Sequence, residues 1–387
     1  MRSLVRLLVL MLIGITSASG LDIKPSPTKR KGSDLLFRIH RSEGWGFVNQ
    51  AGKVVIPPKF EAAGDFFRGL ARVNVGRKWG FINARGEFRI KPQFDMAGDF
   101  LDALAPVRVG RKWGYINESG QIAIPLQFQG ADEFHEGVAR FEIWTRMRCE
   151  EEKGPKIYTQ ENAPESLFAM EDLWFYLYSK CQSEDGRIGF IDSKGKITIC
   201  PQFLSAESFS EGLAVVRPNA APKHGYINLR GEMGIPPKFD EARSFHQGLA
   251  AFRVGLHGEV SWGYIDKSGR VVIQPKFQLT GNFSEGLAAA KVDGQNWGYI
   301  NQSGAFAIKP RFLRASDFSE GLAAVESEYR KGSRYESYID QTGKEVLKVT
   351  VRGWPFVDGL AVAGEEGRRV YIDKTGKVIT PFESFRK

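Results

Sequence analysis

Short runs that alternate apolar and polar residues recur along this chain, separated by turn residues, about once every 35 positions. The third copy, residues 103–128, is the clearest, with three such runs joined by two turns. Alternation with a period of two predicts strands that have one buried face. A fixed spacing of this length predicts a repeat architecture, in which each unit buries its apolar face against its neighbours.

Two kinds of turn punctuate each unit. The first, Val75–Lys78 in copy two, places Gly76 and Arg77 between extended runs, which favours a type II′ hairpin. The second has Asn or Asp at its first position and Gly at its fourth, which is type I turn chemistry in which the glycine can form a bulge. It recurs nine times, starting at Asn49, Asn83, Asn117, Asp192, Asn228, Asp266, Asn301, Asp340 and Asp373.

The third run of most units ends in Ile-x-Pro-x-Phe, as in Ile90–Phe94. Proline cannot donate a hydrogen bond to a sheet, so this run is predicted to lie at a sheet edge or to leave the sheet there. A connector then leads to Phe-x-x-Gly-Leu-Ala, as in residues 283–288, which begins the first strand of the next unit.

These turns set a pairing register, which copy two illustrates. Across the first hairpin Ala71 faces Ile82 and Val73 faces Gly80, and across the second Ile82 faces Phe88 and Gly80 faces Ile90. Paired residues share a face, so these residues form one apolar face with a gap at Gly80. Such a gap indicates the close approach of another backbone or of a neighbouring aromatic side chain. Trp79 and Phe81 then lie on the opposite face.

Tryptophan therefore recurs at one structural position of the repeat. The five intact Trp-Gly copies begin at Trp45, Trp79, Trp113, Trp262 and Trp297, and degraded copies begin at Ile188, His224, Ser337 and Val370. If this face is open, its aromatic and Arg side chains form a candidate surface for sugar rings, a polymer or a peptide. The alternative is that the rings pack between adjacent units, which the need for two packed faces per layer favours.

Together, the Trp-Gly-Tyr/Phe-Ile-Asn/Asp, Ile-x-Pro-x-Phe and Gly-Leu-Ala motifs resemble the WG-repeat (KWG-repeat) family of bacterial β-rich proteins. The resemblance covers roughly residues 43–382 apart from one insertion. It implies a repeat scaffold, often exported, with no common catalytic activity. We expect an all-β tandem array of about nine three-stranded units in an open β-solenoid-like superhelix. The alternative is a closed β-propeller-like ring, although propellers usually have four strands per blade and eight or fewer blades.

The N-terminal segment differs from the array. Arg2 and Arg6 precede a short apolar run and the small residues 16–20, which is the pattern of a signal peptide. We therefore expect a signal at 1–20, a linker at 21–42, the array at 43–382 and a tail at 383–387, with a periplasmic or secreted location. No later segment is apolar enough to span a bilayer.

An insertion at 142–187 interrupts the first hairpin of copy four. Pairing Ala139 with Ile191 gives a register in which Cys149 and Cys181 also lie opposite each other, so we expect a disulfide between them in an exported protein. Cys200 is then left over as a small buried residue. The segment from Glu142 to Gly186 has a net charge of −5, which is compatible with a partner-binding projection or with a tolerated loop excursion.

The remaining chemistry argues against an enzyme. The five histidines occupy variable or substituted repeat positions, and no phosphate loop, zinc motif or catalytic triad is present. We expect no cofactor, no metal and no specific nucleic-acid binding. The sequence predicts a non-catalytic exported scaffold that binds a protein or a cell-envelope polymer. A purely structural envelope component, or an enzyme with its site in residues 142–187, is the alternative. The formal charge of +9 is compatible with an anionic surface partner or with an ordinary solvated surface.

Overall fold

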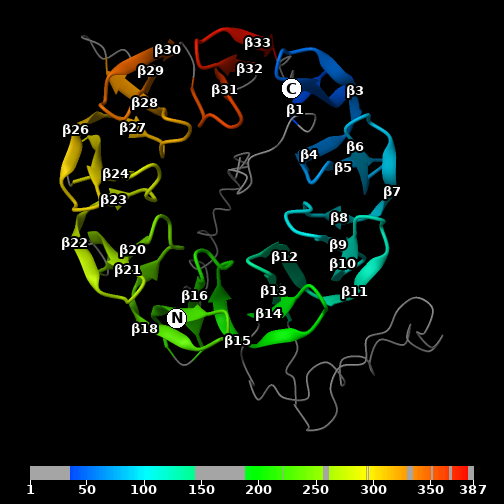
Figure 1. Ribbon diagram of the computed structural model, residues 1–387, viewed down its shortest axis with the longest axis horizontal. Helices are drawn as coiled ribbons and strands as arrows, with labels where there is room; N and C mark the ends of the chain where they lie inside the picture. The colour runs from blue at the N-terminus through cyan, green and yellow to red at the C-terminus, as the bar shows by residue number, and fades with distance from the viewer. Residues whose placement is uncertain are drawn as a thin grey trace, which may run out of the picture.

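The protein is a closed ring of small antiparallel β units (Figure 1). This computed structural model describes residues 35–143, 188–219, 221–255, 261–292, 294, 296–328, 334–349, 352–365 and 368–381. These residues form 33 strands and no helix. The all-β tandem array predicted from the sequence is therefore confirmed. No helix in this part of the chain is long and apolar enough to span a membrane.

The first five units run from β1 to β18, with each unit's last strand at the outer rim (Figure 1). β15 serves two units, because its N-terminal part is the outer strand of unit four and its end pairs with β16 of unit five. The strand bounds are β1 Leu36–Arg41, β2 Gly44–Asn49, β3 Val54–Phe60; β4 Ala62–Phe67, β5 Leu70–Val75, β6 Lys78–Asn83, β7 Phe88–Phe94; β8 Met96–Ala97, β9 Leu104–Val109, β10 Lys112–Asn117, β11 Ile122–Phe128; β12 Gly130–His135, β13 Val138–Glu142, β14 Ile188–Asp192, β15 Ile197–Ala206; β16 Leu213–Pro218, β17 His224–Asn228 and β18 Met233–Phe239.

Units six to nine repeat the same order. Their strand bounds are β19 Glu241–Ala242, β20 Leu249–Val254, β21 Ser261–Asp266, β22 Val271–Phe277; β23 Leu279–Thr280, β24 Leu287–Lys291, β25 Trp297–Asn301, β26 Phe306–Phe312; β27 Arg314–Ala315, β28 Ala323–Glu328, β29 Arg334–Ile339, β30 Glu345–Val349; β31 Leu360–Glu365, β32 Arg368–Asp373 and β33 Val378–Pro381.

The first and last units meet, so the predicted open superhelix is wrong and the closed ring is correct (Figure 1). The Gln50 side chain of unit one donates to the Asp358 carbonyl of unit nine at 2.9 Å. The rings of Phe37 and Tyr371 pack edge to face with centroids 5.5 Å apart. Leu360 of unit nine joins the buried cluster of unit one. Contacts between the two end units thus replace the exposed caps that an open array would need.

Two features of the individual units contribute to this closure, and the sequence predicted neither of them. The connector after most outer strands folds back as a short innermost strand, so several units have four strands, as in the order β4-β5-β6-β7. In addition, residues expected to lie in the linker form β1, which pairs with β2. The array therefore begins before residue 43, and unit one offers a complete face to unit nine.

The Trp-Gly and Ile-x-Pro-x-Phe motifs are explained by one bulge. The pairs Ala71–Ile82, Val73–Gly80 and Ile82–Phe88 are confirmed, but Ile90 pairs with Phe81 and not with Gly80, because the register shifts between β6 and β7. A Cβ on Gly80 would lie 2.5 Å from the Ile90 carbonyl oxygen and 2.6 Å from the Pro92 nitrogen. The predicted close approach is therefore that of the bulged backbone of the edge strand.

Both faces of each unit are buried. Ala71, Val73 and Ile82 share one face, as predicted, and pack against unit one. Ile90, which was assigned to the same face, packs with Phe81 against unit three, so its predicted placement was wrong. Phe88, assigned to that face, is exposed. At the interior seams the Phe of Phe-x-x-Gly-Leu-Ala packs against the aromatic residue two positions after Trp in the preceding unit. In unit three, where the motif reads Phe-x-x-Ala-Leu-Ala, the Phe81–Phe100 centroids lie 4.9 Å apart.

The turns match their residues. Gly52 has φ 80° and donates to the Asn49 carbonyl, while the Asn49 side chain accepts from the amides of Ala51 and Lys53. This is the predicted type I turn with a glycine bulge. The first hairpin of copy two differs from prediction, because both Gly76 and Arg77 have positive φ, which identifies a type I′ turn in place of type II′.

Candidate binding sites on the ring

The five tryptophans lie at the seams between units. Trp262 is 4% exposed, and the other four are half-buried. Each packs against the hydrophobic cluster of its seam; the rings concerned are Trp45, Trp79, Trp113, Trp262 and Trp297. The candidate aromatic face therefore contributes to packing between units over most of its area.

An arginine covers many of these rings. At the seam between units two and three, the Arg72 guanidinium carbon lies 5.5 Å from the Trp79 ring centroid. Its other contacts reach unit three, with a hydrogen bond to the Ala97 carbonyl at 2.7 Å and Nε 2.8 Å from a carboxylate oxygen of Asp99. Burial raises the pKa of Asp99 to about 6, against the opposing charge of Arg72. This seam is filled by one cation, one indole and one carboxylate.

The seam between units five and six has different residues at the same positions. The register places His224 where unit two has Trp79, and Val215 where it has Arg72. Ser244 of unit six replaces Asp99. These smaller side chains leave a cavity of about 470 Å³, which is open to solvent. Its volume lies within the range of roughly 300–1,000 Å³ that is usual for small-molecule sites.

The polar groups of this seam pocket are held in place by protein contacts. The Ser244 hydroxyl donates to Glu207 at 2.6 Å, and Glu241 lies 3.2 Å from the Arg253 guanidinium. Arg243 donates to the Thr280 carbonyl at 2.6 Å and lies 4.3 Å from the Trp262 ring centroid.

Two histidines complete the pocket wall. His224 Nδ1 lies 3.1 Å from the Asp240 carbonyl, which can only accept, so this nitrogen carries a proton and donates. Burial lowers the pKa of His246, opposed by the charges of Glu211 and Glu207. The neutral imidazole is therefore favoured at His246 near neutral pH.

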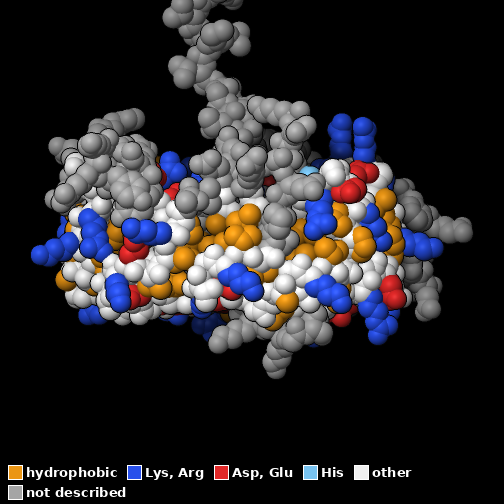
Figure 2. Space-filling model, turned by 90° about the horizontal axis from the view of Figure 1, so that it is seen from above, with side chains coloured by type: hydrophobic (Ala, Val, Ile, Leu, Met, Phe, Trp, Pro, Cys, Tyr) orange, Lys and Arg blue, Asp and Glu red, His pale blue; other side chains and the backbone are white. Residues whose placement is uncertain are grey.

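The outer strands form a second candidate surface, which we call the outer belt. These nine strands, β3, β7, β11, β15, β18, β22, β26, β30 and β33, carry eight Lys or Arg and one acidic residue, Glu345, which pairs with Lys348 at 3.4 Å. The eight cations are all exposed: Lys59, Arg89, Lys91, Lys238, Lys276, Lys309, Arg311 and Lys348. Figure 2 shows hydrophobic side chains along one side of this rim, with Lys and Arg projecting beside them.

The apolar part of the belt comes from the same strands. Val55, Phe88, Val272, Val346 and Val378 are each at least 39% exposed. Several belt cations lie over the buried phenylalanine beside them, as Lys276 does with its nitrogen 5.2 Å from the Phe277 ring centroid. The belt therefore offers positive charge next to accessible apolar surface.

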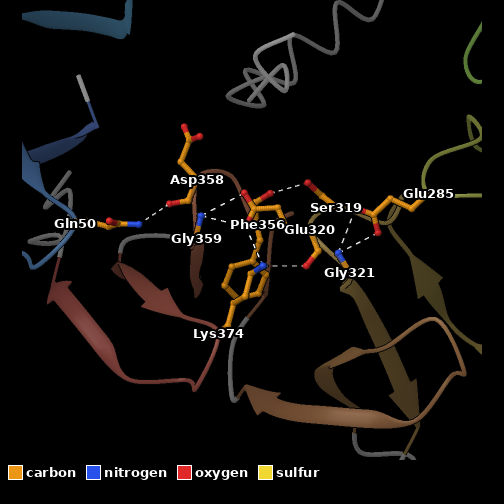
Figure 3. Close-up of polar contacts among 9 residues, drawn as sticks. All are labelled: Gln50, Glu285, Ser319, Glu320, Gly321, Phe356, Asp358, Gly359 and Lys374. Carbon is orange, nitrogen blue, oxygen red and sulfur yellow. Dashed lines mark hydrogen bonds and ion pairs between the residues drawn. The ribbon is translucent and has the colours of Figure 1, made fainter. Parts of the chain in front are cut away.

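The inner turns, by contrast, use their carboxylates to hold the ring together (Figure 3). Glu285 and Glu320 accept from the backbone amides of Gly321 and Gly359 in the following units, at 2.9 and 3.0 Å. Each glutamate has a positive φ, which costs energy for a residue other than glycine. We interpret the hydrogen bond to the next unit as the compensation for this conformation.

No catalytic or metal centre is apparent in the part of the chain that the structure describes. No group of three or more His, Cys, Asp or Glu residues there is arranged to hold a metal ion. The described acidic turns use their side chains on their own backbone, as Asp266 does for Ser268 and Arg270.

The cysteines give a partial correction. Cys200 is disulfide-bonded, so the expectation that it is left over is wrong. Cys149 and Cys181 lie outside the described residues. The Cys149–Cys181 disulfide therefore stays a prediction. The hairpin register that suggested that pair does hold at its base, where Ala139 pairs with Ile191.

Sequence comparison assigns the repeats to a known family. Seven segments match the WG containing repeat: residues 45–79, 79–113, 113–143, 188–219, 225–255, 262–295 and 297–329. The chain belongs to the WG-repeat family. These matches cover more than half of the WG-repeat chain, so the resemblance read from its motifs is confirmed. No curated protein matches it in sequence.

Comparison with solved structures finds weak similarities to this WG-repeat ring. AztD from Citrobacter koseri is 10% identical with a TM-score of 0.41, covering 91% of this chain and 95% of its own. The computationally designed Ika8 protein is 9% identical with a TM-score of 0.40, covering 84% of this chain and 96% of its own. At these scores the likeness carries no argument about function.

One residue in the sequence marks the altered unit that forms the seam pocket. His224 stood out as a replacement for a repeat tryptophan, which identified an altered unit. The pocket also depends on Val215 and on Ser244 of the next unit, and only the seam brings these three together. The outer belt was missed because its cations are scattered singly in sequence and gather only when the edge strands align around the rim.

Proposed function

We propose that this protein is an exported, non-catalytic ring scaffold that binds a protein or a cell-envelope polymer, and that the preferred partner is an anionic polymer. The observation that carries the proposal is the outer belt, with eight exposed cations and one paired acid on the rim strands. A surface of one charge sign raises the local concentration of an oppositely charged chain and speeds its association.

The geometry of the belt supports a long partner better than a small one. The cations recur on β3, β7, β18, β22, β26 and β30, which lie at intervals along the circumference (Figure 1). A flexible anionic chain that follows the rim contacts several of these strands at once, and linked contacts of this kind raise the overall affinity. Proline in the rim strands, such as Pro92 and Pro310, disfavours strand addition as the mode of binding.

The test compares retention on dextran sulfate and on neutral dextran. The triple variant R89E/K91E/K309E reverses three belt cations, and retention on dextran sulfate at low salt is expected to fall about tenfold or more. The matched control R85E/R111E/K194E makes the same charge change at exposed turn residues and is expected to retain most of the binding. Equal loss in both variants would show that net charge alone is responsible and would reject the belt.

The proposed location has its own experiment. Fractionation of cells that produce the full chain is expected to place the protein outside the cytoplasm, with an N-terminus near residue 21 in the exported form. An intact N-terminus in the cytoplasmic fraction would reject export. Specific belt binding with no turnover supports the scaffold over an enzyme, and no retention on any envelope fraction would favour a purely structural role.

A further inference from the structure

We infer that the seam pocket between units five and six is a binding site for a neutral, hydroxyl-rich saccharide of one or two rings. None of the eight belt cations lines this pocket, so the inference is independent of the anionic polymer proposed for the rim. It rests on one difference between two seams. The arginine, tryptophan and aspartate that fill the seam between units two and three are replaced by smaller residues between units five and six.

The cavity results from the side chains of this seam and not from a different arrangement of its strands. The strands on both sides of the seam pair in the same register as elsewhere in the ring, and Tyr226 still packs against Phe245 with centroids 5.0 Å apart. The Tyr226 hydroxyl also donates across the seam to the Arg243 carbonyl at 2.8 Å. The two units therefore meet normally beneath the pocket, and side-chain substitution at its wall accounts for the cavity.

The charge of the wall selects against ionic ligands. Glu241 is paired with Arg253, and the Arg243 guanidinium is engaged by the Thr280 carbonyl and the Trp262 ring. An anion would meet the Glu207 carboxylate, with only the already engaged guanidinium of Arg243 to offset its charge. A cationic amine would use the acceptors and leave the arginine and Asn282 donors unmatched.

Hydroxyl groups satisfy both kinds of partner, because each donates one hydrogen bond and accepts others. Among the residues that line the pocket, Glu207 has acceptor oxygens, Arg243 and Asn282 have donor groups, and His224 adds a further polar ring. Val215, Ala206 and Ala242 give an apolar wall for the carbon-bound hydrogens of a sugar ring. Since Glu207 and Arg243 are already fixed by other groups, little side-chain entropy remains to be lost on binding.

The experiment measures binding of N,N′-diacetylchitobiose and maltose by saturation-transfer NMR and titration calorimetry. We expect the native chain to bind at least one of these disaccharides with a Kd at or below about 1 mM. Glucuronic acid and glucosamine are tested in parallel, and both are expected to bind at least tenfold more weakly.

Two variants make the result specific. V215R/H224W restores the residues of unit two and is expected to remove binding by filling the pocket, while leaving retention on dextran sulfate unchanged. Glu207→Gln keeps the pocket volume and is expected to weaken the best disaccharide about fivefold or more by replacing a charged acceptor. Glu207→Gln still tests the inference if V215R/H224W, the variant with the refilled pocket, fails to fold.

Three outcomes would overturn the inference: no binding by either disaccharide, equal binding by the refilled variant when folded, or tighter binding of glucuronic acid or glucosamine. Loss of dextran sulfate retention by R89E/K91E/K309E with disaccharide binding retained would show that the two sites are separate. Failure of the belt proposal would leave the pocket result unaffected, and the reverse also holds.

Discussion

Units two and five share strand order and register but differ where each meets the next unit. Unit two closes its seam with Arg72 stacked on Trp79 and extended to Asp99, whereas unit five presents Val215 and His224 to Ser244. The aromatic pairs beneath are alike, with Phe81–Phe100 at 4.9 Å and Tyr226–Phe245 at 5.0 Å. The comparison shows that the repeat fixes the seam at its buried base and leaves its wall free to vary, so a repeat scaffold can acquire a pocket without losing its fold.

The largest predicted effect tests the part that the two units share. Gly80→Ala and Gly225→Ala each place a Cβ 2.5 or 2.6 Å from the carbonyl oxygen of Ile90 or Ile235. Each is expected to lower the free energy of unfolding by about 3 kcal/mol, because backbone has to move. Chemical denaturation measures this. Gly76→Ala, which meets no atom within 4 Å but has φ 59°, is the control and is expected to cost about 1 kcal/mol. A large loss at Gly80 alone would mean that the bulge is not a shared requirement.

The next prediction addresses the difference between the walls. Trp79→Ala removes a half-buried indole and its cation–π contact and is expected to cost about 2–3 kcal/mol in the free energy of unfolding. His224→Ala borders an existing cavity and is expected to cost no more than about 1 kcal/mol. Urea denaturation of both variants gives the comparison. Equal losses in the free energy of unfolding would contradict the interpretation that unit five has a cavity where unit two has packed side chains.

The third prediction depends on pH. The pKa of Asp99 is raised from 3.8 to about 6 in the folded chain, so the folded state binds a proton over a range in which the unfolded state has released it. The contribution of Asp99 to stability is therefore greatest below about pH 4 and is lost as the pH rises to about 6.

Asp99→Asn should remove this dependence, so the stability difference between variant and native chain is expected to change by about 1–3 kcal/mol between pH 4 and pH 6.5. Ser244→Ala, at the equivalent position of unit six, should show no such change. Thermal unfolding across this pH range measures both, and a constant difference for Asp99→Asn would contradict the raised pKa.

Local chemistry was enough to predict much of this fold. The Asn49 turn, the edge position of the Ile90–Phe94 run and the Ala71–Ile82 register follow from residues close in sequence. The bulge opposite Gly80 was not predicted, because the shift in register depends on how the backbone around Pro92 packs against the neighbouring strand. Closure was not predicted either, since it depends on contacts such as Gln50 with Asp358, which are 308 positions apart.

The candidate binding sites were likewise predicted only in part. The tryptophan position was predicted, and its packing at the seams follows from both faces of each unit being buried. The pocket beside His224 needs side chains from two units, and the rim charge needs the alignment of six strands. Neither arrangement is visible in a single repeat.

Closure of the ring has a consequence for how such a chain can evolve. An open array can gain or lose a unit at its end, with only one interface changed. In a ring, the angle between neighbours and the number of units are tied together, so a tenth unit would require every seam to be reset. Variation is then directed into the places that leave those angles alone, namely the wall residues, the rim and the hairpin between β13 and β14, where the extra segment enters.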